Sequence, residues 1–271
     1  MWLLAFVLGI CSMLLSHSYM SLDFMETFWW NILCTGIVVN IVLLVKCEAI
    51  TNHEKRQKAL SSLFILSNTI RSVFPRIDVE RICYFDSILS TTLVGRSLAT
   101  GAEIALSLQI ATNLLHIMKD STVRSFLPYI LPPAICIAQI LCWIGVLTTN
   151  QLFHVFEESI WAVFFAMLIP LLLQLSRSTA STETKNKLLG CTFLATIYVI
   201  YMVYIDIPMY YGRYSENKKL NIPYLSLTEG IYDVASCKRI TKSYEVWKED
   251  SVWMIGYFVF GSLISVGMIK G

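Results

Sequence analysis

The stretch SILSTTLVGRSLATGAEIALSLQIATNLLHIM, residues 87–118, decides the fold of this chain. It is long enough to cross a bilayer, because roughly 20 mainly apolar residues span the hydrocarbon core. Apart from Arg96 and Glu103 near its middle, the stretch is uncharged. A charge at that depth costs roughly 2.5–3.5 kcal/mol on insertion scales, so these two residues mark the first place to look for a functional site.

The composition of the whole chain is that of a multi-pass membrane protein. Of its 271 residues, 56% are hydrophobic and 15% are charged, and the mean hydropathy is +0.62. A soluble domain needs more charge than this to cover its surface. The net charge of +2 gives no indication of nucleic-acid binding.

Apolar windows of spanning length follow one another along the chain at residues 28–45, 88–110, 126–147, 160–175, 188–205 and 252–269. The N-terminal run, residues 2–15, is either a retained short span or a signal peptide. It lacks a basic n-region and a clear A-x-A cleavage site, which favours the retained span. The sequence therefore predicts one all-α integral membrane domain over residues 1–271, a polytopic transmembrane helix bundle with about seven spans.

The distribution of lysine and arginine predicts the orientation of these spans. Fourteen of the 21 basic residues lie in one alternating set of loops, at positions 46–81 and 213–248, and six lie in the opposite set. Cytosolic loops carry the excess of basic residues. We therefore expect the N-terminus and both long loops to be cytosolic.

The two long loops differ in character. In the first, Ala59 to Phe74 has apolar residues near helical spacing beside polar ones, which predicts an amphipathic helix lying at the membrane interface. The second, residues 208–250, is rich in tyrosine and lysine, a mixture that suits the headgroup region. A cytosolic loop folded against the helix ends explains the second loop equally well.

The central stretch carries a polar stripe. Residues three or four apart share one face of a helix, and this face holds Thr92, Arg96, Thr100, Glu103 and Ser107. Arg96 and Glu103 are separated by about 10 Å along the axis, so we expect each to find its partner elsewhere. In the functional interpretation Arg96 binds an anionic group and Glu103 accepts a proton or binds a cation. The alternative is a polar network that only fixes helix register.

Other polar residues extend the list of candidates. The stretch 87–118 carries polar residues on more than one side, and a helix that is polar on several sides is expected at the centre of a bundle. Asp206 precedes Pro208 at the end of a span, where it either joins the polar site or marks the helix stop. The candidate catalytic residues are Glu103, Asp206 and Asp86, and the candidate substrate-binding residues are Arg96, Thr100, Gln109, Asn113 and His116.

Cysteine and histidine spacing predicts no metal site. The eight cysteines include no C-x-x-C pair and lie mostly in apolar runs, where packing is the favoured role. The four histidines are widely separated and form no H-x-x-x-H motif, which also argues against haem. P-loop, Rossmann and G-x-S-x-G signatures are absent, so the sequence identifies no cofactor and leaves open whether the chain is an enzyme.

Three functions are compatible with these features. The leading hypothesis is a polar site around Arg96 and Glu103 that binds or modifies a lipid or other amphiphile, with membrane lipids as partners. The second is a non-catalytic accessory subunit of a membrane complex, which predicts membrane-protein partners. The third is a small-solute transporter, because interrupted helices expose backbone to a substrate and Pro132, Pro133 and Pro170 lie inside spans.

Overall fold

The protein is described here by a computed structural model, which covers residues 22–270 and gives side chains from Met25 onward. The predicted first span, residues 2–15, lies outside this range. Within it, six helical segments are long and apolar enough to cross a membrane: Met25–Lys46, Thr92–Lys119, Leu127–Thr148, Leu152–Ser178, Thr182–Lys219 and Tyr244–Lys270. Each overlaps one predicted window, so the all-α multi-pass bundle is confirmed.

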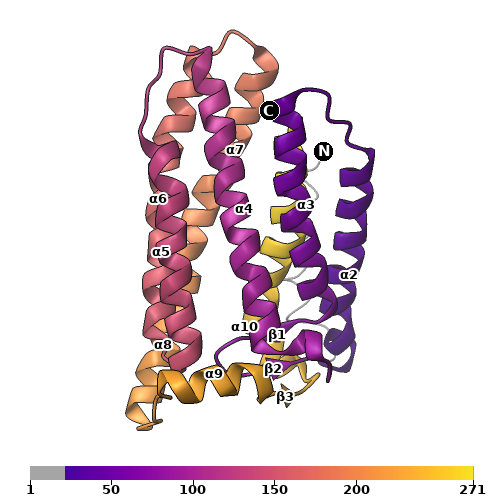
Figure 1. Cartoon of the computed structure of the whole chain (residues 1–271), viewed down its shortest axis with the longest axis vertical. Helices are drawn as coiled ribbons and strands as arrows, with labels where there is room; N and C mark the ends of the chain where they lie inside the picture. Colours follow the sequence, from indigo (N-terminus) through magenta and orange to yellow (C-terminus); the bar gives the residue numbers. More distant parts are fainter. Residues whose placement is uncertain (1–21, 271) are drawn as a thin grey trace.

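The long helices run up and down beside one another (Figure 1). The first five are α2 (Leu22–Lys46), α3 (Asn52–Val73), α4 (Thr92–Lys119), α5 (Leu127–Thr148) and α6 (Leu152–Ser178). Next come α7 (Thr182–Tyr201), a π-helical turn (Met202–Asp206) and α8 (Ile207–Lys219). The last long segment comprises α10 (Tyr244–Met254), a π-helical stretch (Ile255–Gly261), α11 (Ser262–Gly267) and a 3-10 turn (Met268–Lys270).

The prolines that motivated the transporter hypothesis do not interrupt their helices. Pro132 and Pro133 lie inside α5, and Pro170 lies inside α6. Both helices are continuous across them. The departures from α-helical geometry occur instead at the two π-helical segments, one of which ends at Asp206.

Helix α4 is the centre of the bundle, as its polar sides predicted. Its spanning window is 56% buried, against at most 39% for the other candidate spans. On one side it packs against α3 and on the other against α5 (Figure 1). A helix in this position can satisfy polar groups on several faces without exposing them to lipid.

The helix predicted to lie along the interface stands upright instead. Helix α3 packs lengthwise between α2 and α4 (Figure 1), and it begins at Asn52, seven residues before the predicted start at Ala59. Its N-terminus is closed by a capping box, in which the Thr51 side chain accepts from the Glu54 backbone N–H and the Glu54 carboxylate accepts from the Thr51 N–H.

Hydrogen bonds to other helices explain the position of α3. The Gln57 side chain donates to Thr112 Oγ1 on α4 (2.8 Å), and Asn68 donates to Ser262 Oγ on α11 (3.2 Å). Polar residues whose partners lie inside a bundle no longer need the aqueous interface. The sequence pattern showed that α3 has a polar face, but not that this face meets other polar side chains.

The upright α3 also removes the charge asymmetry used to orient the chain. It moves Lys46, Lys55, Arg56 and Lys58 to the end of the bundle that holds the α4–α5 and α6–α7 connections. Counted by helix end, ten basic residues then lie at each end, with Arg96 inside. Equal numbers give no positive-inside preference.

A small sheet closes the other end of the bundle. Strand β1 (Arg76–Ile77) pairs antiparallel with β2 (Ile82–Cys83), and β2 pairs parallel with β3 (Arg239–Ile240). The sheet joins the α3–α4 connection to the segment before α10. Two parts of the chain far apart in sequence are thereby tied together beneath α4.

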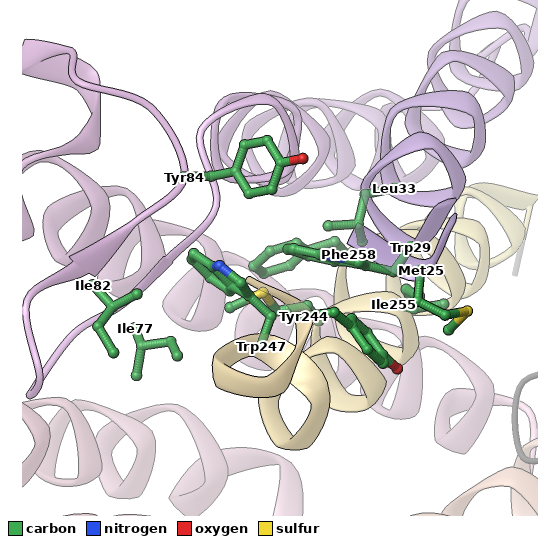
Figure 2. Packing of buried hydrophobic residues seen from close by; sticks show 11 residues of the cluster. Met25, Trp29, Leu33, Ile77, Ile82, Tyr84, Tyr244, Trp247, Ile255 and Phe258 are labelled. Carbon is green, nitrogen blue, oxygen red and sulfur yellow. The ribbon is translucent and has the colours of Figure 1, made fainter. Parts of the chain in front are cut away.

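An aromatic cluster anchors this sheet to the helices (Figure 2). The rings of Trp29 on α2 and Trp247 on α10 stack with centroids 5.2 Å apart, and Tyr84 meets Trp29 edge-on at 5.8 Å. Ile77 and Ile82 of the hairpin belong to the same buried group. Burying aromatic side chains of this size contributes much of the packing energy of such a contact.

The predicted aromatic-rich loop is mostly helical. Residues 208–250 form most of α8, then α9 (Leu227–Ser236), β3 and the first part of α10. Helix α9 lies across the end of the bundle (Figure 1). It turns Gly230 and Val234 inward and leaves the apolar side chains of Leu227 and Ile231 exposed. Helix α9 therefore covers the helix ends and presents apolar side chains on its outer face.

Candidate functional site

The Arg96 guanidinium and the Glu103 carboxylate are in direct contact. Arg96 Nη2 donates to Glu103 Oε1 at 2.6 Å, and both side chains are buried. The expectation that they lie too far apart was therefore wrong. Two turns separate the residues by about 10 Å along the axis, but two long side chains leaning toward each other along one stripe close that gap.

Side chains from two neighbouring helices complete the network. Gln139 on α5 accepts from Arg96 Nη2 at 2.7 Å and donates to Glu103 Oε2 at 2.5 Å. Trp161 on α6 donates its indole N–H to the same Glu103 oxygen at 3.3 Å. The pair therefore joins α4, α5 and α6 through one set of charge-assisted hydrogen bonds.

Further carboxylates surround the same guanidinium. Asp78 Oδ2 and Glu157 Oε1 each lie 3.9 Å from an Arg96 nitrogen. Glu158, on the next position of α6, interacts electrostatically with Asp206, Glu157 and Glu103. Arg76, which pairs with Asp78 at 2.8 Å, and Arg71 add positive charge to this region. The five carboxyl groups of Glu103, Glu157, Glu158, Asp78 and Asp206 still outnumber these three guanidinium groups.

The tip of the β1–β2 hairpin, residues 78–81, closes this region from the end of the bundle. Asp78 faces Arg96, and Glu80 accepts a hydrogen bond from the Gln151 amide at 2.6 Å. Val79 packs with Cys142 of α5 and Val234 of α9. Because Asp78 and Glu80 lie in what the sequence suggested was a cytosolic loop, neither was identified as a site residue.

Arg81 holds the hairpin tip in place. It has a positive φ of 56° and pairs with Asp233 of α9 at 2.5 Å. It also donates to the Val146 carbonyl at 2.9 Å. A non-glycine residue keeps this left-handed conformation where surrounding contacts determine it. The alternation of charged and apolar residues through Arg76–Arg81 is the sequence signal that could have pointed to this insertion.

The two acids of the hairpin tip have opposite pKa shifts. Burial disfavours the charged form of Asp78, but the guanidinium groups of Arg76, Arg96 and Arg71 together outweigh it and lower its pKa. For Glu80, burial dominates and raises the pKa despite the nearby Arg213. Asp78 is thus an ionised partner of the arginines, whereas Glu80 holds its proton more readily.

Asp206 lies at the edge of the same cluster. It is buried at the end of the π-helical turn and accepts a hydrogen bond from the Tyr201 hydroxyl at 3.3 Å. Its carboxyl group interacts electrostatically with Glu157 and Asp250. Of the other predicted residues, Thr100 lies on the Arg96 face and accepts the indole N–H of Trp143 at 3.0 Å.

Four predicted site residues lie elsewhere. Gln109 exchanges hydrogen bonds with Ser265 of α11, and Asn113 bonds to the Met268 carbonyl and to the His53 ring. His116 stacks on His53 with ring centroids 4.0 Å apart. Asp86 is on the surface, paired with Lys238. These residues do not converge with Arg96 and Glu103.

Three donor side chains that sequence spacing did not connect come together next to Arg96. His154 Nδ1 lies 2.8 Å from Glu157 Oε2 on α6 and 3.8 Å from Cys142 Sγ on α5. All three residues are buried. The sequence showed His154 and Glu157 three residues apart, but Cys142 belongs to the preceding helix, so no single-helix motif includes it.

Some buried polar atoms of this region have no hydrogen-bond partner among the described residues. They are Arg96 Nε, His154 Nε2, Glu80 Oε2 and Gln151 Oε1. Buried polar atoms normally bond to protein, water or a ligand. Other such atoms, among them Trp29 Nε1, Gln57 Oε1 and Asn68 Oδ1, lie elsewhere in the bundle.

An apolar groove of about 410 Å³ lies on the outer surface of the same two helices. It is lined by Leu141 of α5 and by Phe156, Ser159, Ile160, Val163 and Phe164 of α6. Leu141, Phe156 and Ser159 are direct neighbours in sequence of Cys142, Glu157 and Glu158. The groove therefore lies at the level of the polar cluster, on the opposite side of α5 and α6.

Comparison of the chain with protein-family models, with curated proteins and with solved structures finds no match. The function must therefore be argued from the residues of this bundle.

Proposed function

We propose that the interior between α4, α5, α6 and the α7–α8 turn binds the polar head of a membrane amphiphile. The observation that carries this proposal is the excess of carboxyl groups over guanidinium groups around Arg96. Glu103, Glu157 and Asp78 lie within 3.9 Å of its guanidinium, and Glu158 and Asp206 extend the acidic cluster. This cluster lies in a bundle of membrane-spanning helices, where uncompensated charge is expensive.

The sign of the surplus selects the chemistry of the ligand. Neighbouring carboxylates in a low-dielectric site cannot all stay ionised unless a cation or added protons compensate them. A phosphate or carboxylate would add to the surplus, although Arg96 alone suggested an anionic ligand. The arrangement instead favours a headgroup that brings positive charge, such as an amine.

Each residue has a role in this proposal. Arg96 holds Glu103 and Gln139 in place through its hydrogen bonds, which makes it a positioning residue. Asp206 lies in the irregular π-helical turn and Glu158 interacts with it, and such turns are frequent at functional sites. These two carboxyl groups are suited to bind an ammonium group or accept its proton.

The groove outside α5 and α6 indicates that the outer surface of this helix pair contacts acyl chains. Its lining is almost entirely apolar and its volume of about 410 Å³ suits part of an acyl chain. Because the groove lies across α5 and α6 from the polar cluster, it is a contact surface for acyl chains and does not itself connect to the headgroup site.

The test compares two ligands that differ only in the head. The full chain in lipid nanodiscs is titrated with hexadecylamine and with palmitate, and bound ligand is measured by native mass spectrometry. We expect the amine to bind and the acid not to bind. Equal binding of both, or preference for palmitate, would contradict the proposal.

Two variants test whether the amine binds at this acidic cluster. Glu158→Gln and Asp206→Asn each remove one carboxylate, and we expect each to weaken amine binding at least tenfold while the chain stays folded. The matched control is Glu183→Gln, the same change at an exposed position of α7, 79% accessible at its side chain. If all three variants bind alike, the amphiphile binds elsewhere.

One observation favours the accessory-subunit alternative. The hydrogen bonds among Arg96, Glu103 and Gln139 form a closed set, as in a network that only fixes helix register. On that alternative neither ligand binds in the bundle. The chain would instead co-purify with the same membrane-protein partner under several mild detergents.

A further inference from the structure

We propose that Cys142, His154 and Glu157 form a binding site for a transition-metal ion of the zinc class. All three side chains are buried, and one donor atom from each lies within 4.8 Å of the other two. The site shares Glu157 with the acidic cluster of the proposed function, but it does not rest on the headgroup ligand, because its other two donors and its bound species are different.

The donor atoms are arranged around a common point. His154 Nδ1 is 2.8 Å from Glu157 Oε2 and 3.8 Å from Cys142 Sγ. In a tetrahedral zinc site, with bonds of about 2.0–2.3 Å, neighbouring donors lie about 3.3–3.6 Å apart. Side-chain adjustments of about 1 Å would therefore bring these atoms to metal-binding distances.

The same geometry argues against a cysteine–histidine catalytic triad. In a triad the imidazole uses one nitrogen for the nucleophile and the other for the acid that orients it. Here Cys142 and Glu157 both approach Nδ1 of His154. The Cys142 side chain is also fully buried, so it presents no nucleophile to a substrate.

The backbone places the three donors together. His154 and Glu157 are three residues apart near the start of α6 and share a face. A connection of three residues, 149–151, turns α5 back against α6 and brings Cys142 opposite them. Gly145, one turn after Cys142, leaves room for the ring, because a Cβ there would lie 3.3 Å from His154 Cδ2.

The donor types select the metal. A thiolate with an imidazole and a carboxylate is a combination that zinc accepts, whereas magnesium and calcium prefer oxygen donors alone. With Zn²⁺, one thiolate and one carboxylate the site is electrically neutral, which suits its place inside the membrane bundle.

The surroundings complete the site. Arg96 lies 3.9 Å from Glu157 Oε1, close enough to help orient this carboxylate. His154 Nε2 has no hydrogen-bond partner among the described residues, and the ring stacks on Tyr210 with centroids 5.0 Å apart. Three protein donors leave the fourth zinc position for water or a ligand, as in catalytic sites.

The test measures metal stoichiometry. The full chain, purified in detergent and stripped with a chelator, is loaded with Zn²⁺, dialysed and analysed by elemental mass spectrometry. We expect one tightly bound zinc per chain. Cys142→Ser, His154→Ala and Glu157→Gln should each lower the affinity for Zn²⁺ at least tenfold, with thermal melting reporting whether each variant is folded.

A cysteine on the same helix supplies the control. Cys136 is exposed on α5, so Cys136→Ser makes the same atomic change outside the site and should keep the zinc. Equal zinc content in Cys142→Ser and Cys136→Ser would overturn the proposal, as would a wild-type chain that retains no zinc.

A measurement with Co²⁺ tests Cys142 as a ligand even if the variants do not fold. Co²⁺ bound to wild-type protein through a thiolate gives a sulfur-to-metal charge-transfer band in the near ultraviolet. We expect this band in wild type and in Cys136→Ser. Its absence from Co²⁺-loaded wild type would exclude Cys142 as a ligand. Amphiphile binding is measured without added metal, so the two proposals can fail separately.

Discussion

At the residue scale, the carboxyl groups inside this bundle outnumber the guanidinium groups that neutralise them. Arg96 touches Glu103 and Gln139 directly and has Asp78 and Glu157 at 3.9 Å. A buried ion pair adds little net stability, but removing one partner leaves an uncompensated charge. Substitutions of Arg96 should therefore lower the stability of the protein by more than the loss of one hydrogen bond would.

Arg96→Ala should lower the free energy of unfolding by about 3–5 kcal/mol, because Glu103 and Glu157 lose their nearest cation. The double variant Arg96→Met with Glu103→Leu removes both charges of the direct pair and should recover part of that loss. Thermal melting in detergent measures both variants. A double variant less stable than the single one would show that the pair is not the main source of the penalty.

Asp78 should make stability depend on pH. The nearby arginines lower its pKa, so the stabilising contribution is present at neutral pH and is lost as the pH falls through the acidic range. We expect Asp78→Asn to be clearly less stable than wild type near pH 7, and the difference to shrink below about pH 4, where an unperturbed aspartate protonates. Melting curves across this range test it, and a constant difference would contradict it.

At the element scale, α9 and the hairpin tip depend on close backbone contacts with α5. A Cβ at Gly230 of α9 would lie 2.0 Å from the Leu147 carbonyl oxygen, which is part of a backbone and cannot swing aside. Arg81 and Asp233 form a second link between the hairpin and α9. Position 230 therefore has to be glycine, because any side chain there would collide with the backbone of α5.

Gly230→Ala should lower the free energy of unfolding by about 1–3 kcal/mol, the usual cost of overpacking, by pushing α9 away from the end of α5. The control is Gly101→Ala in α4, where an added Cβ meets nothing within 4 Å. Alanine there should be neutral or stabilise by about 0.5–1 kcal/mol, because glycine is unfavourable inside a helix. Equal losses of stability in both variants would mean that the α9–α5 contact is unimportant.

At the scale of the whole molecule, the upright α3 fixes which connections share an end of the bundle. Cys47, at the end of α2, lies at the end opposite to Cys237, which follows α9 (Figure 1). An α3 lying flat along the interface would instead place both cysteines on the same side of the membrane. The native cysteines thus distinguish the two arrangements.

Single-cysteine variants that keep either Cys47 or Cys237 should react with a membrane-impermeant thiol reagent from opposite sides of sealed vesicles. Both positions are at least partly exposed, so each thiol is accessible to the reagent. Labelling of both from the same side would mean that α3 does not stand across the membrane. The same experiment determines the orientation of the chain, which the equal basic counts leave unassigned.

The sequence by itself determined the membrane class, the approximate windows of the six described spans and the central position of α4. These features follow from hydropathy and from the polar faces of one helix, which are local properties of the chain. It also singled out Arg96, Glu103 and Asp206 as candidate site residues, because charges within or at the edge of an apolar run are visible without any partner.

The tertiary structure alone decided which groups those charges meet. Gln139 and Trp161 reach Glu103 from α5 and α6, Asp78 arrives on a hairpin from an apparently soluble loop, and Cys142 joins His154 across a helix turn. Each contact joins elements whose relative position no local pattern encodes. Helix α3 shows the physical reason most clearly, since its polar face fits either water or other helices, and only packing against α4 and α11 selects between them.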